Sequence, residues 1–162
     1  MNILERQERY SITESDKNVS DYLKFAPSEI YSSVQNADVV IMPSHGTEDL
    51  FFAGTIDTYD FLRENNLEVE IFATDDEYKE LNLHGADIWL GSFIVTNIIL
   101  PTFCSILGAF VYEKLKAKKD DHISVKIMLE DKDGKTKAVS YDGNADKFKS
   151  VLKDIKKFSN EK

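Results

Sequence analysis

The sequence predicts a mixed α/β fold, in which a βαβ unit and an antiparallel β-hairpin share one sheet with helices packed on it. Three observations predict it. Residues 37–42 form a largely β-branched run that is apolar except for Asp38. Residues 123–129 and 135–141 form two strand-like segments around a turn, and apolar residues recur at helical spacing over 145–158. The expected order of elements is α-β-α-β-α-β-β-α.

The length bounds the number of domains. A chain of 162 residues with 42% hydrophobic residues can bury a core without disulfides or metals. The first part is polar and weakly periodic, and no linker of low complexity interrupts the rest. We therefore expect a loosely ordered segment over 1–25 and a single α/β domain over 26–162.

The front of this domain predicts the βαβ unit. Pro27 suits the first turn of a short helix, because proline lacks a donor that this position does not need. The run 37–42 is typical of a strand buried on both faces. Acidic residues after Thr47 favour a helix from there to about Asn65. The alternating segment 67–72 then predicts a second strand, parallel to the first.

The last third predicts the hairpin and a closing helix. Apolar and other residues alternate over 123–129, and residues 131–134 form a turn. The segment 135–141 pairs back as the second strand. Residues 142–144 are expected to break it, and Asn144 is expected to cap the helix that follows.

Residues 88–112 contain no charged side chain, which leaves three interpretations open. A run of this length qualifies as a transmembrane candidate, with lysines at its end. Its many polar and helix-breaking residues favour a buried core instead, with a helix from Pro101 to about Lys119. The third interpretation is an exposed apolar face that binds a partner.

Charge is distributed unevenly along the chain. Residues 1–112 hold 6 Lys and Arg against 19 Asp and Glu, or −13, and residues 113–162 hold 14 against 10, or +4, which together give −9. An excess of negative charge disfavours nucleic acid as a partner, because phosphates would be repelled. The single cysteine and the lack of a signal-peptide pattern predict a cytoplasmic location.

One arrangement suggests covalent catalysis. Ser44, His45 and Gly46 follow the first buried strand, as in the histidine motif of caspase-like peptidases, where the histidine serves as base for a cysteine. Cys104 lies 59 residues further on. It sits in an apolar helical segment, which favours a packed thiol over a nucleophile. A small hydrolase with His45 and Cys104 remains an alternative prediction.

Other chemistries find little support in the sequence. The three histidines, His45, His84 and His122, are far apart, and the acidic run 75–80 lacks the alternating spacing of a calcium loop. Asp75 and Asp76 follow the second strand without the glycines of a dinucleotide site. We expect no metal and no cofactor. The candidate interaction residues are Trp89, Ile98, Phe103 and Phe110.

The C-terminal part resembles a known family. The segment 112–115, the strand at 123–129, the turn at Asp133 and Gly134, the strand at 135–141 and the helix over 148–155 resemble effector-associated constant component modules of bacterial anti-phage systems. The resemblance covers about the last 65 residues and does not include the βαβ unit. It implies a non-enzymatic adaptor that links an effector to a sensor, and it carries over no catalytic residue.

These observations favour a protein-interaction or adaptor module, whose partner is an effector or a second copy of the chain. Two alternatives stay open. One is the small hydrolase around His45 and Cys104, and the other is a membrane-anchored protein through residues 88–112.

Overall fold

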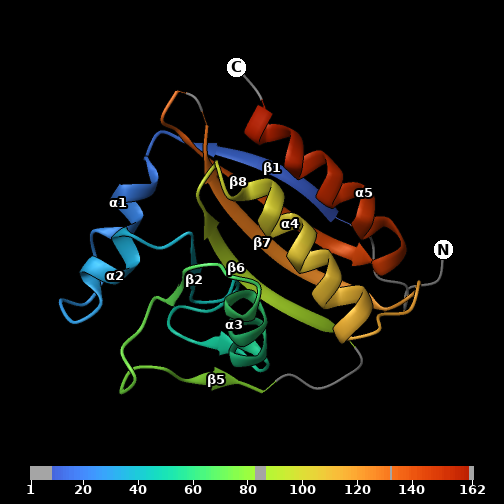
Figure 1. The fold of residues 1–162 in the computed structure, drawn as a ribbon, viewed down its shortest axis with the longest axis horizontal. Helices are drawn as coiled ribbons and strands as arrows, with labels where there is room; N and C mark the ends of the chain where they lie inside the picture. The colour runs from blue at the N-terminus through green and yellow to red at the C-terminus, as the bar shows by residue number, and fades with distance from the viewer. Residues whose placement is uncertain (1–8, 83–86, 132, 161–162) are drawn as a thin grey trace.

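The computed structural model describes residues 9–82, 87–131 and 133–160, and it confirms the mixed α/β fold (Figure 1). A six-stranded sheet has the order β1-β8-β7-β6-β2-β4, and a two-stranded sheet joins β3 and β5. The strands are β1 (Arg9–Ser15), β2 (Val39–Met42), β3 (Phe51–Phe52), β4 (Val69–Ile71), β5 (Glu80–Leu81), β6 (Ile88–Val95), β7 (His122–Glu130) and β8 (Thr136–Asn144). The α-helices are α1 (Val19–Leu23), α2 (Tyr31–Gln35), α3 (Thr55–Glu64), α4 (Leu100–Ala109) and α5 (Ala145–Lys156). A π-helical turn (Phe110–Lys114) continues α4, and a 3₁₀ turn (Lys157–Asn160) continues α5.

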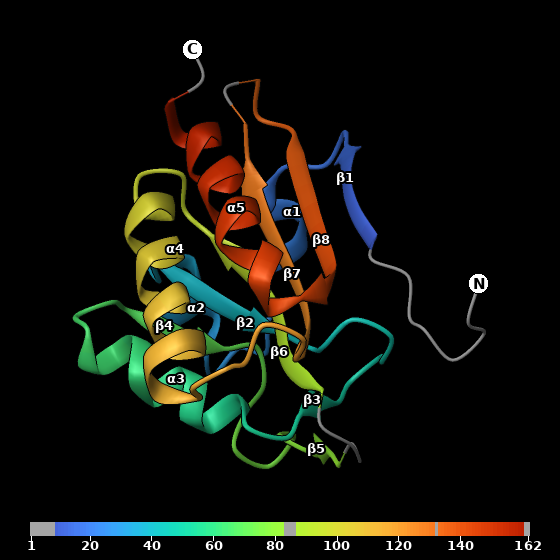
Figure 2. The same cartoon turned by 90° about the vertical axis from the view of Figure 1, so that its right-hand side faces the viewer.

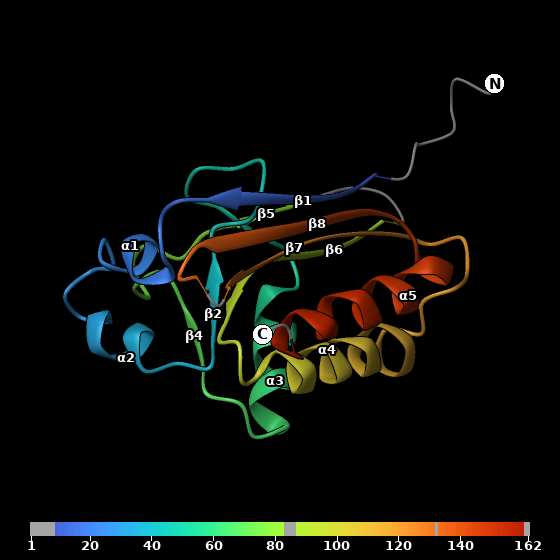
Figure 3. The ribbon, with the colours of Figure 1, turned by 90° about the horizontal axis from the view of Figure 1, so that it is seen from above.

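The helices cover the two faces of the large sheet unequally. Helices α3, α4 and α5 lie together on one face, and α1 and α2 lie toward one end of the sheet (Figures 2 and 3). We call the face under α3, α4 and α5 the core face and the other the second face. Strand alternation assigns residues to each face: Phe93 of β6 contacts Phe103 of α4 on the core face, so Ser92 and Ile94 point to the second face.

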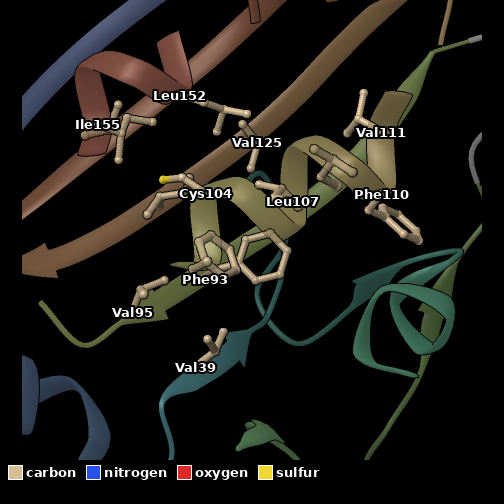
Figure 4. Packing of buried hydrophobic residues seen from close by; sticks show 14 of the residues in the cluster. Val39, Phe93, Val95, Cys104, Leu107, Phe110, Val111, Val125, Leu152 and Ile155 are labelled. Carbon is tan, nitrogen blue, oxygen red and sulfur yellow. The ribbon is translucent and has the colours of Figure 1, made fainter. Parts of the chain in front are cut away.

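The core face holds the main hydrophobic core (Figure 4). Alternate residues of β7, beginning with Ile123, are buried there against α4 and α5. A smaller cluster on the second face gathers around Val34, Val40, Ile94 and Met128, beneath α1 and α2. The alternation seen in the sequence over 123–129 therefore separates a fully apolar side from a mixed side.

The βαβ unit is confirmed, with β2 and β4 parallel and adjacent and α3 between them in the chain. The helix begins at Thr55, so the predicted start at Thr47 was wrong. The Thr47 hydroxyl donates to the carbonyls of Ser44 and Leu50, which holds a turn in place of a helix. The helix ends where predicted, at Asn65.

The hairpin of β7 and β8 is also confirmed, and Asn144 is the residue before α5. The predicted break at 142–144 was wrong, because these residues continue β8 and pair with residues 122–124 of β7. The Asn144 side chain makes no capping hydrogen bond. Backbone pairing to a long neighbouring strand outweighs the local preference of Asp, Gly and Asn for turns.

The uncharged stretch divides into a strand and a helix, which confirms the buried-core interpretation. Strand β6 lies between β2 and β7, and α4 packs on it. The helix ends in the π-helical turn at Lys114, short of the predicted Lys119, and Lys116 has a positive φ of 55°. Among the described residues, no helix has the length and apolarity needed to span a bilayer.

In the segment expected to be loosely ordered, residues 9–25 contain a strand that the sequence did not predict and a short helix, and residues 1–8 lie outside the described ranges. Strand β1 pairs antiparallel with β8 over its whole length, and α1 follows it. Residues 9–14 are exposed, so they show little of the hydrophobic pattern by which a strand is recognised. The short helix expected after Pro27 begins at Tyr31, after a turn.

Candidate functional site

Three polar side chains meet on the second face of the sheet, and we call them the His45 cluster: His45, Ser92 and Ser124. His45 lies in the loop that leaves β2, Ser92 lies on β6 and Ser124 on β7. The His45 Nε2 atom is 2.7 Å from the Ser124 hydroxyl, and Nδ1 is 3.2 Å from the Ser92 hydroxyl. The Ser92 hydroxyl also accepts from the backbone N–H of His45 at 3.0 Å. Both ring nitrogens therefore have a partner.

A β-bulge shapes the neighbourhood of this cluster. The register of β6 against β7 shifts between Trp89 and Gly91, and Gly91 has a φ of 115°, which favours glycine. Because of the bulge, Trp89 and Ser92 pair with second-face residues of β7 although they are three positions apart. The Trp89 ring contacts Phe52, whose ring in turn contacts His45 edge-on at 4.9 Å between centroids. Aromatic rings thus cover one side of the histidine.

The surroundings of His45 favour its neutral form. Burial is the main cause that lowers the pKa of His45, and the positive charge of Lys126 lowers it further, while Asp142 acts in the opposite direction. The Asp142 carboxylate itself accepts a hydrogen bond from His122 Nε2. A neutral imidazole with one donor and one acceptor nitrogen matches two hydroxyl partners, each of which can donate or accept.

Cys104 is not part of this cluster. It lies on α4 in the core face, near Leu152 and Ile155 of α5 (Figure 4). The sheet therefore separates it from His45, which bonds to second-face serines, and the structure does not bring the predicted pair together. Burial raises the pKa of the Cys104 thiol to about 12, so almost no thiolate is present at neutral pH. The structure thus excludes a Cys104–His45 dyad in this conformation.

The four candidate interaction residues have different environments. Phe103 and Phe110 are 0% and 3% exposed, so they belong to the core and cannot contact a partner. Ile98, in the turn before α4, is 87% exposed. Trp89 is partly exposed and packs on Phe52. Only the last two remain available at the surface.

The acidic loop after β4 offers no metal site. Glu77 accepts hydrogen bonds from the backbone and hydroxyl of Thr74, which makes it part of a local turn. Asp75 and Asp76, with Glu29 and Glu70, line a hollow of about 530 Å³ whose charge would repel a dinucleotide. No group of three or more His, Cys, Asp or Glu side chains in the described ranges is arranged to hold a metal ion. His84 lies outside those ranges.

A second surface feature is a groove between α4 and α5, which we call the α4–α5 groove. Its floor is formed by small and apolar residues, and lysines of α5 line its rim. The lining residues are Cys104, Ser105, Gly108, Ala109, Tyr112, Glu113, Lys149, Leu152, Lys153 and Lys156. Its volume is about 390 Å³. Neither Lys149 nor Lys153 forms an ion pair with a described carboxylate, and the Lys149 ammonium lies 4.8 Å from the centroid of the Tyr112 ring in the same groove. Both positive charges can therefore attract an acidic ligand.

Sequence reasoning missed the two serines and the groove. In the sequence, Ser92 is one of several polar residues in the uncharged stretch, and Ser124 is one of the polar positions in the alternating segment 123–129. The available signal for Ser124 was that it falls on the same side of its strand as Lys126, whereas no other polar residue in the sequence of β6 marks the side of Ser92. The groove depends on how α4 and α5 pack together, which the two helices do not reveal separately.

Comparison with known proteins identifies no relative of this chain: no family model, curated protein sequence or solved structure matches it. The function must therefore be argued from the residues themselves.

Proposed function

We propose that this chain is a cytoplasmic protein-interaction module, an adaptor whose partner presents an acidic, amphipathic helix to the α4–α5 groove. The observation that carries the proposal is the combination of an apolar floor with a rim of lysines. A helix laid in such a groove would bury apolar side chains against Gly108, Ala109 and Leu152, and its carboxylates would meet the lysines.

Charge supports this assignment of partner. The chain carries a net charge of −9, yet the part that follows α4 is positive. An acidic partner would be repelled by most of the surface and attracted to this groove, which favours one docking position. The resemblance to constant component modules of anti-phage systems covers the segment that contains α4 and α5. Because of this resemblance, we also propose that the chain is an accessory component of an anti-phage system.

The test is a pull-down of the tagged chain at native expression, compared across three forms. The groove variant is Lys149→Glu with Lys153→Glu. The control is Lys114→Glu with Lys116→Glu, which makes the same change in net charge at exposed positions outside the groove lining. A stoichiometric partner retained by the wild type and the control but lost by the groove variant supports the proposal. A partner retained by all three forms, or no partner, contradicts it.

A second candidate function follows from the His45 cluster. A nucleophile bonded to Nε2 and an orienting group bonded to Nδ1 is the arrangement of a catalytic triad, and here Ser124 and Ser92 occupy those places. In a hydrolase, Ser124 Oγ would attack an acyl carbon and its proton would pass to Nε2. The bond to the leaving group would break, the leaving group would depart with that proton, and water would then cleave the acyl-serine ester and restore the hydroxyl. Ser124 is only 3% exposed, so a substrate would need local opening of the loop around His45.

A fluorophosphonate probe tests this candidate. Reaction would form an Oγ–P bond, break the P–F bond and leave the serine proton on His45. Labelling of the wild type that is lost in Ser124→Ala and His45→Ala, but kept in Ser150→Ala on the outside of α5, would support the hydrolase. An unlabelled wild type would exclude a reactive serine and leave the adaptor as the sole proposal.

A further inference from the structure

The large sheet has two edge strands of very different character. Strand β4 is three residues long and is flanked and interrupted by Glu68 and Glu70. Strand β1 has seven residues, pairs with β8 on one side, and has no strand on its other side among the described residues (Figure 3). Short length and repeated charge protect β4 from edge-to-edge pairing, and β1 has neither.

The composition of β1 lacks the other devices that block pairing. The strand contains no proline and no glycine, and its ladder with β8 runs without a bulge. The strand has two charged residues, Arg9 and Glu14, and their opposite charges give β1 a net charge of zero. In a chain with a net charge of −9, this edge is a neutral stretch on which two copies can approach with little repulsion.

Two large apolar side chains stand exposed on the same side of this strand. Tyr10 and Ile12 are 42% and 48% exposed, and Tyr10 contacts Tyr141 of β8 edge-on at 6.4 Å between ring centroids. Because Tyr141 belongs to the main core, both side chains project on the core face, beyond α5. They would be partly covered if another strand were added at this edge.

We infer that β1 pairs antiparallel with β1 of a second copy of the chain, with the two-fold axis at Ile12. The axis is perpendicular to the sheet, so the core faces of the two copies form one continuous face. Each residue of β1 then lies opposite a β1 residue of the second copy whose side chain is on the same face of the joined sheet. Ile12 then faces Ile12 of the second copy, Tyr10 faces Glu14, Ser11 faces Thr13 and Arg9 faces Ser15. Within β1, no like charges are opposed in this register, and the phenol of Tyr10 is placed to donate to the Glu14 carboxylate of the second copy.

The dimer would join the two six-stranded sheets into one and leave the α4–α5 grooves open. Helix α5 packs on β7 and β8, and α4 lies on its far side, over β6, away from the β1 edge. The inference therefore stands independently of the adaptor proposal, and an adaptor with this dimer would present two equal binding grooves.

A cysteine placed at the axis tests the register directly. The one native cysteine, Cys104, is 1% exposed, so Ile12→Cys adds an accessible thiol to a chain that otherwise presents none. Mild oxidation should convert most of this variant into a covalent dimer, because cross-strand Cβ atoms at a two-fold axis lie within disulfide reach. The matched control is Thr13→Cys, which faces Ser11 of the second copy and should remain largely unlinked. Equal cross-linking of both variants, or linking of Thr13→Cys alone, would overturn the register.

The mass in solution tests the dimer itself. Light scattering after size exclusion should give twice the chain mass for the wild type and a single chain mass for Ile12→Lys, which places two positive charges together at the axis. Because Ile12 is exposed, the variant should keep the circular dichroism spectrum of the wild type. A wild type with the mass of one chain at all concentrations would overturn the inference, and so would an Ile12→Lys variant that remains dimeric. The Lys149→Glu, Lys153→Glu variant should stay dimeric whether or not it binds a partner.

Discussion

The two faces of the sheet show how one set of strands serves two purposes. The core face carries a continuous apolar cluster under three helices, whereas the apolar cluster of the second face is smaller and lies beneath α1 and α2. Elsewhere the second face holds Ser92, Ser124, His122 and Lys126. The difference indicates that the core face supplies most of the free energy of unfolding. The second face can therefore carry polar groups at defined positions with little loss of stability.

The largest effect should come from the core face. Phe103→Ala removes a side chain that is 0% exposed and packs against Phe93 with tilted rings, so it leaves a cavity between α4 and the sheet. We expect the free energy of unfolding to fall by about 3–5 kcal/mol, as measured by urea denaturation. Phe25→Ala, at a position that is 75% exposed, is the control and should change it by less than about 0.5 kcal/mol. Similar losses in both variants would contradict the contrast between core and surface.

A truncation in the smaller cluster should have a lesser effect. Met128 is 8% exposed and lies on the second face with Ile94 and Val40. Met128→Ala should lower the free energy of unfolding by about 2 kcal/mol, at the low end for such changes, because α1 and α2 are short and can relax onto the gap. A loss equal to that of Phe103→Ala would show that the second face contributes as much stability as the core face.

The His45 cluster gives a pH-dependent contribution that the core face lacks. His45→Gln leaves two nearly buried serine hydroxyls with poorer partners, and we expect a loss of about 1–2 kcal/mol near neutral pH. Because the pKa of His45 is lowered in the folded chain, the unfolded chain binds more protons once the pH falls below 6.5. The wild type therefore loses stability on acidification through this residue, and the variant does not.

The measurement is a pair of denaturation curves at about pH 7.5 and about pH 5 for each protein. The difference in stability between wild type and His45→Gln should narrow as the pH falls. Since all other titrating groups are shared, a difference that stays constant or widens would show that the folded-state pKa of His45 is not lowered.

The smallest effect concerns Cys104. With the thiol buried and its pKa raised to about 12, a thiol reagent should label the native chain far more slowly than the chain in denaturant. Cys104→Ala should leave fluorophosphonate labelling, if any is found, unchanged. Rapid labelling of the native chain would mean that α4 and α5 separate readily.

Local patterns predicted the elements that bury a repeated apolar face. The alternation over 123–129 and the helical spacing over 145–158 correspond to β7 and α5, and the βαβ unit also emerged from its apolar runs. Strand β1 could not be predicted from a local pattern, because its side chains are exposed and its conformation depends on pairing with the backbone of β8. The division of the uncharged stretch into β6 and α4 likewise depends on its neighbours, since its composition alone also fits a membrane span.

The sequence by itself determined the fold class, the single thiol, the unequal charge and the position of His45 directly after a buried strand. Only the tertiary structure decided that His45 meets Ser92 and Ser124 instead of Cys104, since a sheet lies between them. It also decided that Phe103 and Phe110 are core residues, and that lysines of α5 line a groove with α4. The physical reason is that periodicity records which side of an element is buried, whereas a site depends on which elements become neighbours, and that is set by long-range packing.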